Sequence, residues 1–356
     1  MSATTVDEFA GRLFESVLGA MDMWSIYLGE QLGFYDAMAA GDPITKDELA
    51  DATGADARYT CEWLEQQAVG GIIEVDDASL PQDERRYSLP EGHAEVLTSR
   101  DSLNYLAPFV RMMTASGVQL PALLNAYRSG GGVSWEQFGP DMRTGQADMN
   151  RPWFLAALGS DWFPAVDDLH ERLRAGGTVA DVGCGEGWSS IAIAQAYPDA
   201  IVDGFDLDGP SIERARGHAE GAGVADRVAF HHADAGKVDR SGEFDVVTAF
   251  EFIHDLPHPV AVLSTMRSLA KDDGHVVVMD EKVSESFPGR GDDVERLMYG
   301  FSLFICLPDG MSHPDSAATG TVMRPETLGA YAREAGFTDL EILPIENDLW
   351  RFYRLS

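Results

Sequence analysis

Three alternating glycines stand where an apolar, strand-like segment changes into a helical one. Residues 179–188 read Val-Ala-Asp-Val-Gly-Cys-Gly-Glu-Gly-Trp. Gly183, Gly185 and Gly187 allow a tight turn and bring backbone N–H groups at a helix start close to a ligand, where a Cβ would collide. The spacing differs from the dinucleotide pattern G-x-G-x-x-G, because Trp188 takes the place of the third glycine. The segment therefore predicts a binding turn for a cofactor other than NAD.

One histidine and several acids offer acid–base chemistry. His254 and Asp255 come just after one apolar segment, and Asp280 and Glu281 come just after the next. Imidazole titrates near neutrality, so His254 is suited to accept a hydroxyl proton. Asp255 or Asp280 could orient the ring, and Glu281 is the next candidate. The alternative is a histidine without chemistry beside a helix start.

A metal site is a further interpretation of the same region. His254, Asp255 and His313 provide two imidazoles and a carboxylate, the set expected for ferrous or ferric iron. Spacing alone does not separate such a triad from a metal-free His-Asp pair. We therefore assign no metal and take His254, Asp255 and Asp280 as the catalytic residues.

The elements that must position these side chains follow an alternating order. Strand-like runs alternate with helical stretches of about 10 to 15 residues, which predicts a parallel, doubly wound α/β sheet. Two last strands are separated by only Glu346-Asn347-Asp348, too short for a crossover helix, so we expect an antiparallel hairpin with one strand reversed at the sheet edge. The expected strands cover residues 179–182, 200–206, 228–234, 244–250, 274–279, 340–345 and 349–355.

The pattern Asp-x-Gly-x-Gly-x-Gly at residues 181–187 resembles motif I of the class I methyltransferases that use S-adenosyl-L-methionine (SAM). The resemblance implies their Rossmann-like, seven-stranded sheet, and a site for SAM and its product S-adenosyl-L-homocysteine (SAH). Asp206, about 20 residues after the glycines, would accept the ribose hydroxyls, and Asp234 would accept from the adenine amine. The implied cofactor-binding residues are Asp181, Gly183, Gly185, Gly187, Asp206, Leu207, Asp234, Ala235 and Phe250.

The N-terminal third predicts a mainly helical winged-helix domain. Residues 6–38 carry apolar side chains at helical spacing, which must bury a face or pack against another chain. A capping box at residues 45–48 opens a short helix that Gly54 ends, and Asp56 starts a second helix. Residues 72–75 and 86–89 are expected to pair as the wing. The second helix and the wing are rich in acids, which opposes DNA binding.

A winged helix ahead of a SAM domain resembles the small-molecule O-methyltransferases of the hydroxyindole and caffeate type and their bacterial relatives. That resemblance implies a dimerisation domain at residues 1–100, a helical connector at 101–165 and a methyltransferase domain at 166–356. It further implies methyl transfer to a small-molecule hydroxyl by a homodimer, with His254 as base. Two alternatives stay open: an iron-dependent C-methyltransferase of an α-keto acid, and a SAM-binding transcriptional regulator without activity.

Composition narrows the class of partner. The chain of 356 residues carries 59 acidic against 26 basic side chains, a formal net charge of −33, which repels nucleic-acid phosphates and anionic membranes. Cys61, Cys184 and Cys306 are scattered and odd in number, so neither a disulfide framework nor a zinc cluster is indicated. No leader-like or membrane-spanning run is evident. We expect a cytoplasmic protein.

Overall fold

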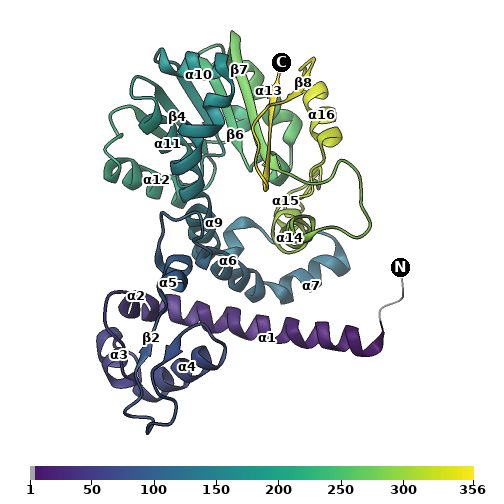
Figure 1. Ribbon diagram of the computed structural model, residues 1–356. Helices are drawn as coiled ribbons and strands as arrows, with labels where there is room; N and C mark the ends of the chain where they lie inside the picture. Colours follow the sequence, from purple (N-terminus) through teal and green to yellow (C-terminus); the bar gives the residue numbers. More distant parts are fainter. Residues whose placement is uncertain (1–4) are drawn as a thin grey trace. The chain divides into compact units, whose positions relative to one another are not determined.

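The computed structural model describes residues 5–356, which form two compact units (Figure 1). One unit contains the chain up to Ala115 together with Thr144–Pro152, and the other contains Ser116–Arg143 and Trp153–Ser356. The first unit is helical with one two-stranded sheet, and the second holds a seven-stranded sheet.

The first unit confirms the predicted winged helix. Thr45 and Glu48 form the capping box that starts α3, and Gly54, with a φ of 72°, ends it. Asp56 accepts from the backbone of Arg58 to cap α4, and β1 pairs antiparallel with β2 as the wing. The elements up to residue 118 are α1 (Val6–Gln31), α2 (Phe34–Ala39), α3 (Lys46–Thr53), α4 (Ala57–Val69), β1 (Glu74–Val75), β2 (Tyr87–Ser88), α5 (Glu91–Thr98) and α6 (Ala107–Val118).

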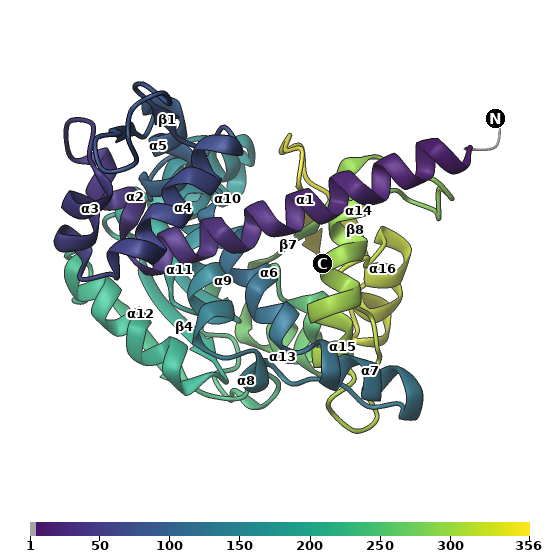
Figure 2. The same cartoon turned by 90° about the horizontal axis from the view of Figure 1, so that it is seen from below.

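The periodic segment 6–38 is divided into two helices. Gly33 adopts a φ of 71°, a left-handed conformation that ends α1 and redirects the chain into α2. Phe34, Tyr35 and Met38 of α2 are buried in the unit's core. Helix α1, seen along its length in Figure 2, buries only Gly29. Most apolar side chains of α1 are therefore uncovered in the single chain.

A helical region precedes the large sheet. Pro152 lies inside α9, and the helix continues beyond it as the wider π-helical segment η1. A proline lacks the N–H that a regular helix uses, which accounts for a change of helical geometry at this point. The elements are α7 (Leu120–Ser129), α8 (Trp135–Phe138), α9 (Pro140–Trp153), η1 (Phe154–Trp162), η2 (Phe163–Ala165) and α10 (Asp167–Arg174).

The large sheet has the strand order β5-β4-β3-β6-β7-β9-β8, with β9 antiparallel to both of its neighbours. Its strands are β3 (Thr178–Val182), β4 (Ile201–Asp206), β5 (Val228–His232), β6 (Phe244–Phe250), β7 (Ala270–Glu281), β8 (Leu340–Ile342) and β9 (Trp350–Leu355). The connecting helices are α11 (Trp188–Ala196), α12 (Gly209–Gly221), η3 (Ala235–Lys237), η4 (Ile253–Asp255), α13 (Pro259–Leu269), α14 (Asp293–Phe301), η5 (Ser302–Cys306), α15 (Leu307–Gly310) and α16 (Pro325–Glu334).

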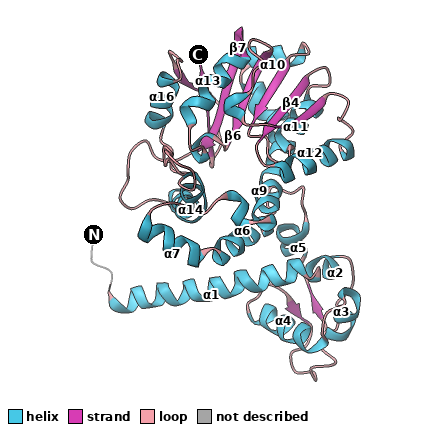
Figure 3. Cartoon of the chain, turned by 180° about the vertical axis from the view of Figure 1, so that it is seen from behind, coloured by secondary structure: helices cyan, strands magenta, loops and turns pink. Residues whose placement is uncertain are grey.

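Helices cover both faces of this sheet, as Figure 3 shows. Alternate strand residues face opposite sides, so Val246 packs with α10, α11 and α12, whereas Val247 packs with α13 and α16. Both faces are apolar because both are covered. The polar side chains of the predicted site lie at the carboxyl ends of the parallel strands.

Three details of the sheet differ from the sequence prediction. The reversed strand β9 lies between β7 and β8, not at the edge, because the short hairpin folds β8 onto its outer side. Strand β7 extends to Glu281, since β9 pairs with it along residues 276–281. Strand β5 ends at His232, because Asp234 caps η3 instead of continuing the strand.

Candidate active site

The glycine turn joins β3 to α11 in a conformation that favours glycine. Gly183, Gly185 and Gly187 have φ values of 76°, 51° and 85°. A Cβ on Gly187 would come within 2.4 Å of Cζ of Phe230, whereas a Cβ on Gly185 would meet nothing within 4 Å. The turn is therefore packed against protein at one glycine and borders open space at another.

Asp181 lies behind the turn. Its carboxylate accepts hydrogen bonds from the hydroxyls of Ser189 and Ser190, both at 2.6 Å, and of Thr248 at 3.0 Å. Burial raises the pKa of Asp181, and the three hydroxyl donors oppose the rise. The sequence predicts Asp181 as a cofactor contact, whereas the structure uses its carboxylate to tie α11 to β3 and β6.

Asp206 stands at the carboxyl end of β4, directly beside the turn. Its Oδ2 accepts from the backbone N–H of Gly185 at 2.8 Å, and its Oδ1 accepts from that of Asp208 at 2.8 Å. Burial raises the pKa of Asp206, and these two amides counter the rise. Leu207 follows with 63% of its surface exposed. The backbone thus fixes the carboxylate at the open side of the turn.

The other predicted cofactor residues divide into two groups. Asp234 caps η3 by accepting from the N–H of Gly236, and it pairs with Lys237 at 2.7 Å, which holds the pKa of Asp234 below its usual value. Ala235 is buried next to it. Phe250 is a core residue, packed against the rings of Phe154 and Phe163. Asp234 thus lies two residues beyond the end of β5, where it caps η3, whereas Phe250 lies in the hydrophobic core.

His254 is almost completely buried, with 3% of its side chain exposed, and carboxylates surround both of its ring nitrogens. Asp280 Oδ1 lies 2.9 Å and Glu281 Oε2 3.0 Å from Nδ1, and Asp255 Oδ1 lies 3.3 Å from Nε2. Burial alone would lower the pKa of His254, but the charges of Asp255, Glu281 and Asp280 outweigh it and raise the pKa well above the usual range.

The pKa values of the two acids at the end of β7, Asp280 and Glu281, are shifted in opposite directions. Burial favours the neutral form of both. The charge of His254 overcomes burial at Asp280 and lowers its pKa. Burial prevails at Glu281, and Asp280 adds to it, so the pKa of Glu281 is raised well above its usual value. Of these two acids, Asp280 is accordingly the one whose ionised form is favoured beside the histidine.

Two residues that sequence reasoning did not assign also belong to this region. Cys306, at the end of η5, lies close to His254 and Asp255. Asp309 of α15 accepts from the backbone N–H of Trp135 at 2.7 Å. Burial, reinforced by the charge of Asp255, raises the pKa of Asp309 to about 7. No local sequence signal marks either residue, because both reach the site only through the fold of the segment after β7.

A third missed feature is Glu251, at the carboxyl end of β6. It has a φ of 48°, unusual for a residue with a side chain. Its carboxylate accepts a hydrogen bond from the indole N–H of Trp350, whose ring stands edge-on to that of Trp153. The sequence contains no signal for this pairing across 99 residues.

The iron triad considered from the sequence is not assembled. Within residues 5–356, the potential metal ligands that come together are His254 with Asp255 and Cys306, and His254 with Asp280 and Glu281. His313 is exposed and belongs to neither group. It lies beyond the end of α15, where the chain turns away after Gly310. Among the described residues, the structure therefore does not bring His313 together with His254 and Asp255.

Comparison with known proteins identifies the family. The chain is 35% identical over 186 residues to 27-O-demethylrifamycin SV methyltransferase from Amycolatopsis mediterranei (strain S699), covering 49% of this chain and 68% of that protein. The chain belongs to the SAM-dependent methyltransferase family. Residues 173–306 of this methyltransferase match the family model of a methyltransferase domain, and residues 20–99 match that of the Rv2258c-like winged HTH domain.

Solved structures share the fold of the methyltransferase over nearly its whole length. Mitomycin 7-O-methyltransferase MmcR aligns with a TM-score of 0.73 at 21% identity, covering 99% of each chain. Human N-acetylserotonin methyltransferase in complex with SAM aligns with a TM-score of 0.71 at 19% identity, covering 100% of this chain and 99% of the human one. Over residues 5–356, none of the methyltransferase's helices has the length and apolar run that a membrane crossing requires.

Proposed function

We propose that the protein transfers the methyl group of SAM to a hydroxyl oxygen of a small molecule, with His254 as the general base. The observation that carries the proposal is the position of Asp280 Oδ1, 2.9 Å from His254 Nδ1. An ionised acceptor at Nδ1 favours the tautomer with its proton there, which leaves the lone pair on Nε2. Nε2 is then the atom that accepts the hydroxyl proton.

The residues of the glycine turn fit SAM. Each oxygen of Asp206 accepts one backbone N–H and retains a lone pair for a further donor, so the carboxylate can accept both ribose hydroxyls. The backbone at Gly185 borders space that a side chain would enter. Asp234, at the next strand end, is a further acceptor for the adenine amine. These contacts stay predictions for the cofactor-binding residues.

The bound cofactor supplies a methyl group already activated on a positively charged sulfur. The protein's task is then to hold the acceptor in line, exclude water and take the proton. As Nε2 accepts it, the developing imidazolium is stabilised by Asp280 at 2.9 Å and Asp255 at 3.3 Å. Because the neighbouring acids raise the pKa of His254, its neutral form is a stronger base than an unperturbed imidazole, and the histidine must reach that form by losing a proton before each turnover.

The proposal for the acceptor rests on the relatives and on the segment after β7. The relatives carry names of enzymes that methylate small molecules: a demethylrifamycin, mitomycin and N-acetylserotonin. Phe301, Phe304 and Met311 follow β7 and would give the acceptor pocket apolar side chains that favour a planar or hydrophobic molecule. A panel of phenols, hydroxy acids, amines and keto acids, followed by SAH release, identifies the acceptor class.

The base is tested with His254→Ala. A general base contributes roughly 10²- to 10⁴-fold to the rate, so turnover of the best acceptor should fall by that factor while SAH affinity, measured by calorimetry, stays within about twofold. His313→Ala is the matched control, because His313 is exposed and outside the cluster. Full activity of His254→Ala in a metal-free sample would refute the base.

An enzymatic function is favoured over a DNA-binding regulator by the ion pairs of the winged helix. Arg58 pairs with Glu62 at 2.5 Å, and Arg85 pairs with Glu65 at 2.7 Å. Cations that are already paired with acids add little positive potential for phosphates. A gel shift with the promoter of its own gene at low salt should show no saturable band.

We also propose that α1 pairs with a second copy of the chain. Phe9, Phe14, Met21, Trp24 and Leu28 each keep more than half of their surface exposed, and burying such side chains contributes roughly 1.5–3 kcal/mol each. Light scattering at micromolar concentration and near-physiological salt should give twice the chain mass. Phe14→Glu with Trp24→Glu should give the monomer, whereas a monomeric parent protein would contradict the proposal.

A further inference from the structure

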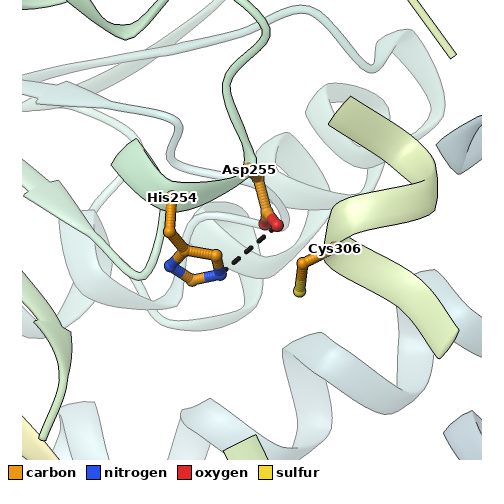
Figure 4. A group of neighbouring side chains, drawn as sticks. All are labelled: His254, Asp255 and Cys306. Carbon is orange, nitrogen blue, oxygen red and sulfur yellow. Dashed lines mark ion pairs between the residues drawn. The ribbon is translucent and has the colours of Figure 1, made fainter. Parts of the chain in front are cut away.

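The side of His254 that faces away from Asp280 and Glu281 meets two other potential metal ligands. His254, Asp255 and Cys306 each place one ligand atom within 4.8 Å of the others. Figure 4 shows the three side chains converging, with the imidazole Nε2 directed at the carboxylate and the thiol beside them. The group therefore has the compactness that one shared ion requires.

Two separate parts of the chain build this group. His254 and Asp255 are consecutive residues of the 3-10 turn η4, just after β6. Cys306 ends the π-helical segment η5, in which the N–H of Leu307 bonds to the carbonyl of Ser302. Wide π-helical turns occur frequently at functional sites. The fold thus directs a cysteine to the same point as the histidine–aspartate pair.

A buried carboxylate oxygen with one long contact lies at the centre of the group. Asp255 Oδ1 is buried and pairs with His254 Nε2 at 3.3 Å, and no shorter hydrogen bond to it is present among residues 5–356. A buried carboxylate oxygen without a donor costs free energy, since it has lost its water. A cation between the imidazole, the carboxylate and the thiol would satisfy it.

The chemistry of the three donors identifies the class of ion. Imidazole nitrogen, carboxylate oxygen and thiolate sulfur together are the ligands of zinc, and three protein ligands with one open position are typical of exchangeable zinc sites. Metal-bound histidines usually donate their other ring N–H to a carboxylate, as the Asp280 contact at Nδ1 allows. Asp255 keeps 33% of its side chain exposed, which gives the ion access from solvent.

We propose that His254 Nε2, the Asp255 carboxylate and the Cys306 thiolate bind one zinc ion. On binding, the thiol and the Nε2–H of His254 each lose a proton to solvent, the sulfur–zinc bond forms, and the lone pair freed on Nε2 is donated to the metal. The site uses the nitrogen that accepts the substrate proton. Zinc binding and methyl transfer therefore exclude each other, and zinc holds the enzyme inactive. Only this last consequence rests on the proposed function.

Cobalt(II) tests the site without any activity measurement. One equivalent of Co²⁺, added to the reduced full-length protein, should give the near-ultraviolet charge-transfer absorption of a cobalt–thiolate bond. Cys306→Ala should abolish this absorption. Asp280→Asn should weaken cobalt binding by about 10- to 100-fold, because it replaces the charged partner of Nδ1 by a neutral acceptor. Cys61→Ala is the matched control, since Cys61 is a buried thiol in the other unit.

Two results would overturn the site: no thiolate absorption in the parent protein, or absorption that survives in Cys306→Ala. SAH binding verifies that each variant is folded. If Cys306→Ala does not fold, Cys306→Ser takes its place.

The inhibitory role is tested separately by comparing each protein with and without zinc. In the parent, one equivalent of zinc should slow methyl transfer by at least about 10-fold, within the contribution of a general base, and a chelator should restore the rate. In Cys306→Ala the ratio should stay near one. A protein that binds cobalt through Cys306 yet keeps its full rate with zinc would refute His254 as base and leave the metal site standing.

Discussion

Replacing Asp309 by asparagine should stabilise the protein, and should do so more strongly as the pH rises. Asp309 accepts from the backbone N–H of Trp135, and an asparagine amide oxygen can accept the same bond. The substitution thus removes a charge while keeping the contact. Burial and the neighbouring Asp255 raise the pKa of Asp309 from 3.8 to about 7, so the folded state disfavours its ionised form.

The sign and size follow from proton linkage. Below a pH of about 3.8 the carboxyl is neutral in both states and costs nothing. Between 3.8 and about 7 the unfolded chain ionises while the folded one does not, so stability falls by about 1.4 kcal/mol for each pH unit. Above 7 the full cost of roughly 4 kcal/mol is reached. From about pH 5.5 to about pH 8.5, the advantage of Asp309→Asn should therefore widen by about 2 kcal/mol.

Urea unfolding followed by tryptophan fluorescence, in the presence of a chelator, measures this difference. The unit containing Asp309 also holds Trp135, Trp153, Trp162, Trp188 and Trp350, five of the seven tryptophans, so the signal reports chiefly on that unit.

The control is Asp245→Asn. Asp245 binds Arg172 at 3.0 Å and Lys271 at 2.8 Å. Although burial opposes ionisation, the donors of Lys271, Thr178 and Arg172 together hold its pKa well below the usual value. The stabilisation that ionised Asp245 contributes is present above pH 3.8, the pKa of this carboxyl in the unfolded chain, and it is lost only as the pH falls below that value. Asp245→Asn should therefore be less stable than the parent by the same amount at both pH values. A constant or narrowing advantage of Asp309→Asn would refute the reasoning.

Two further predictions concern the cofactor turn. Asp206→Ala should weaken SAH binding, measured by calorimetry, by about 30-fold or more, which is the equivalent of about 2 kcal/mol for lost charged hydrogen bonds. Asp203→Ala, on the same strand, is the control and should bind SAH as tightly as the parent. Equal SAH affinities of the two variants would contradict the assignment of Asp206 to the ribose. Gly187→Ala should lower the melting temperature strongly, because its Cβ would lie 2.4 Å from Phe230. Gly185→Ala meets no protein atom within 4 Å, but its φ of 51° strains an alanine by about 1–2 kcal/mol, so it should melt only a few degrees below the parent and lose SAH affinity. Retained affinity would show that Gly185 does not border the cofactor.

The sequence by itself determined the local features of this protein. The helix starts at Thr45 and Asp56, the helix end at Gly54 and the glycine turn at 183–187 each depend on hydrogen bonds or φ values within a few residues. The alternation of apolar strands and helices predicted the doubly wound sheet, and the three-residue link predicted the antiparallel hairpin. The proximity of His254 and Asp280 could also be predicted from the sequence, because parallel strands bring their carboxyl ends to one edge of a sheet.

Only the tertiary structure decided how the polar groups share these positions. Asp181 faces three hydroxyls behind the turn because α11 packs over β3. Glu281 joins Asp280 at the histidine because β9 pairs with β7 along residues 276–281 and extends that strand to its last residue. Cys306 and Asp309 reach the site from a segment whose path no local pattern encodes. The contacts of His254 join residues 26 to more than 50 positions apart through strand pairing and helix packing, so the physical forces that fix them act only once the chain has folded.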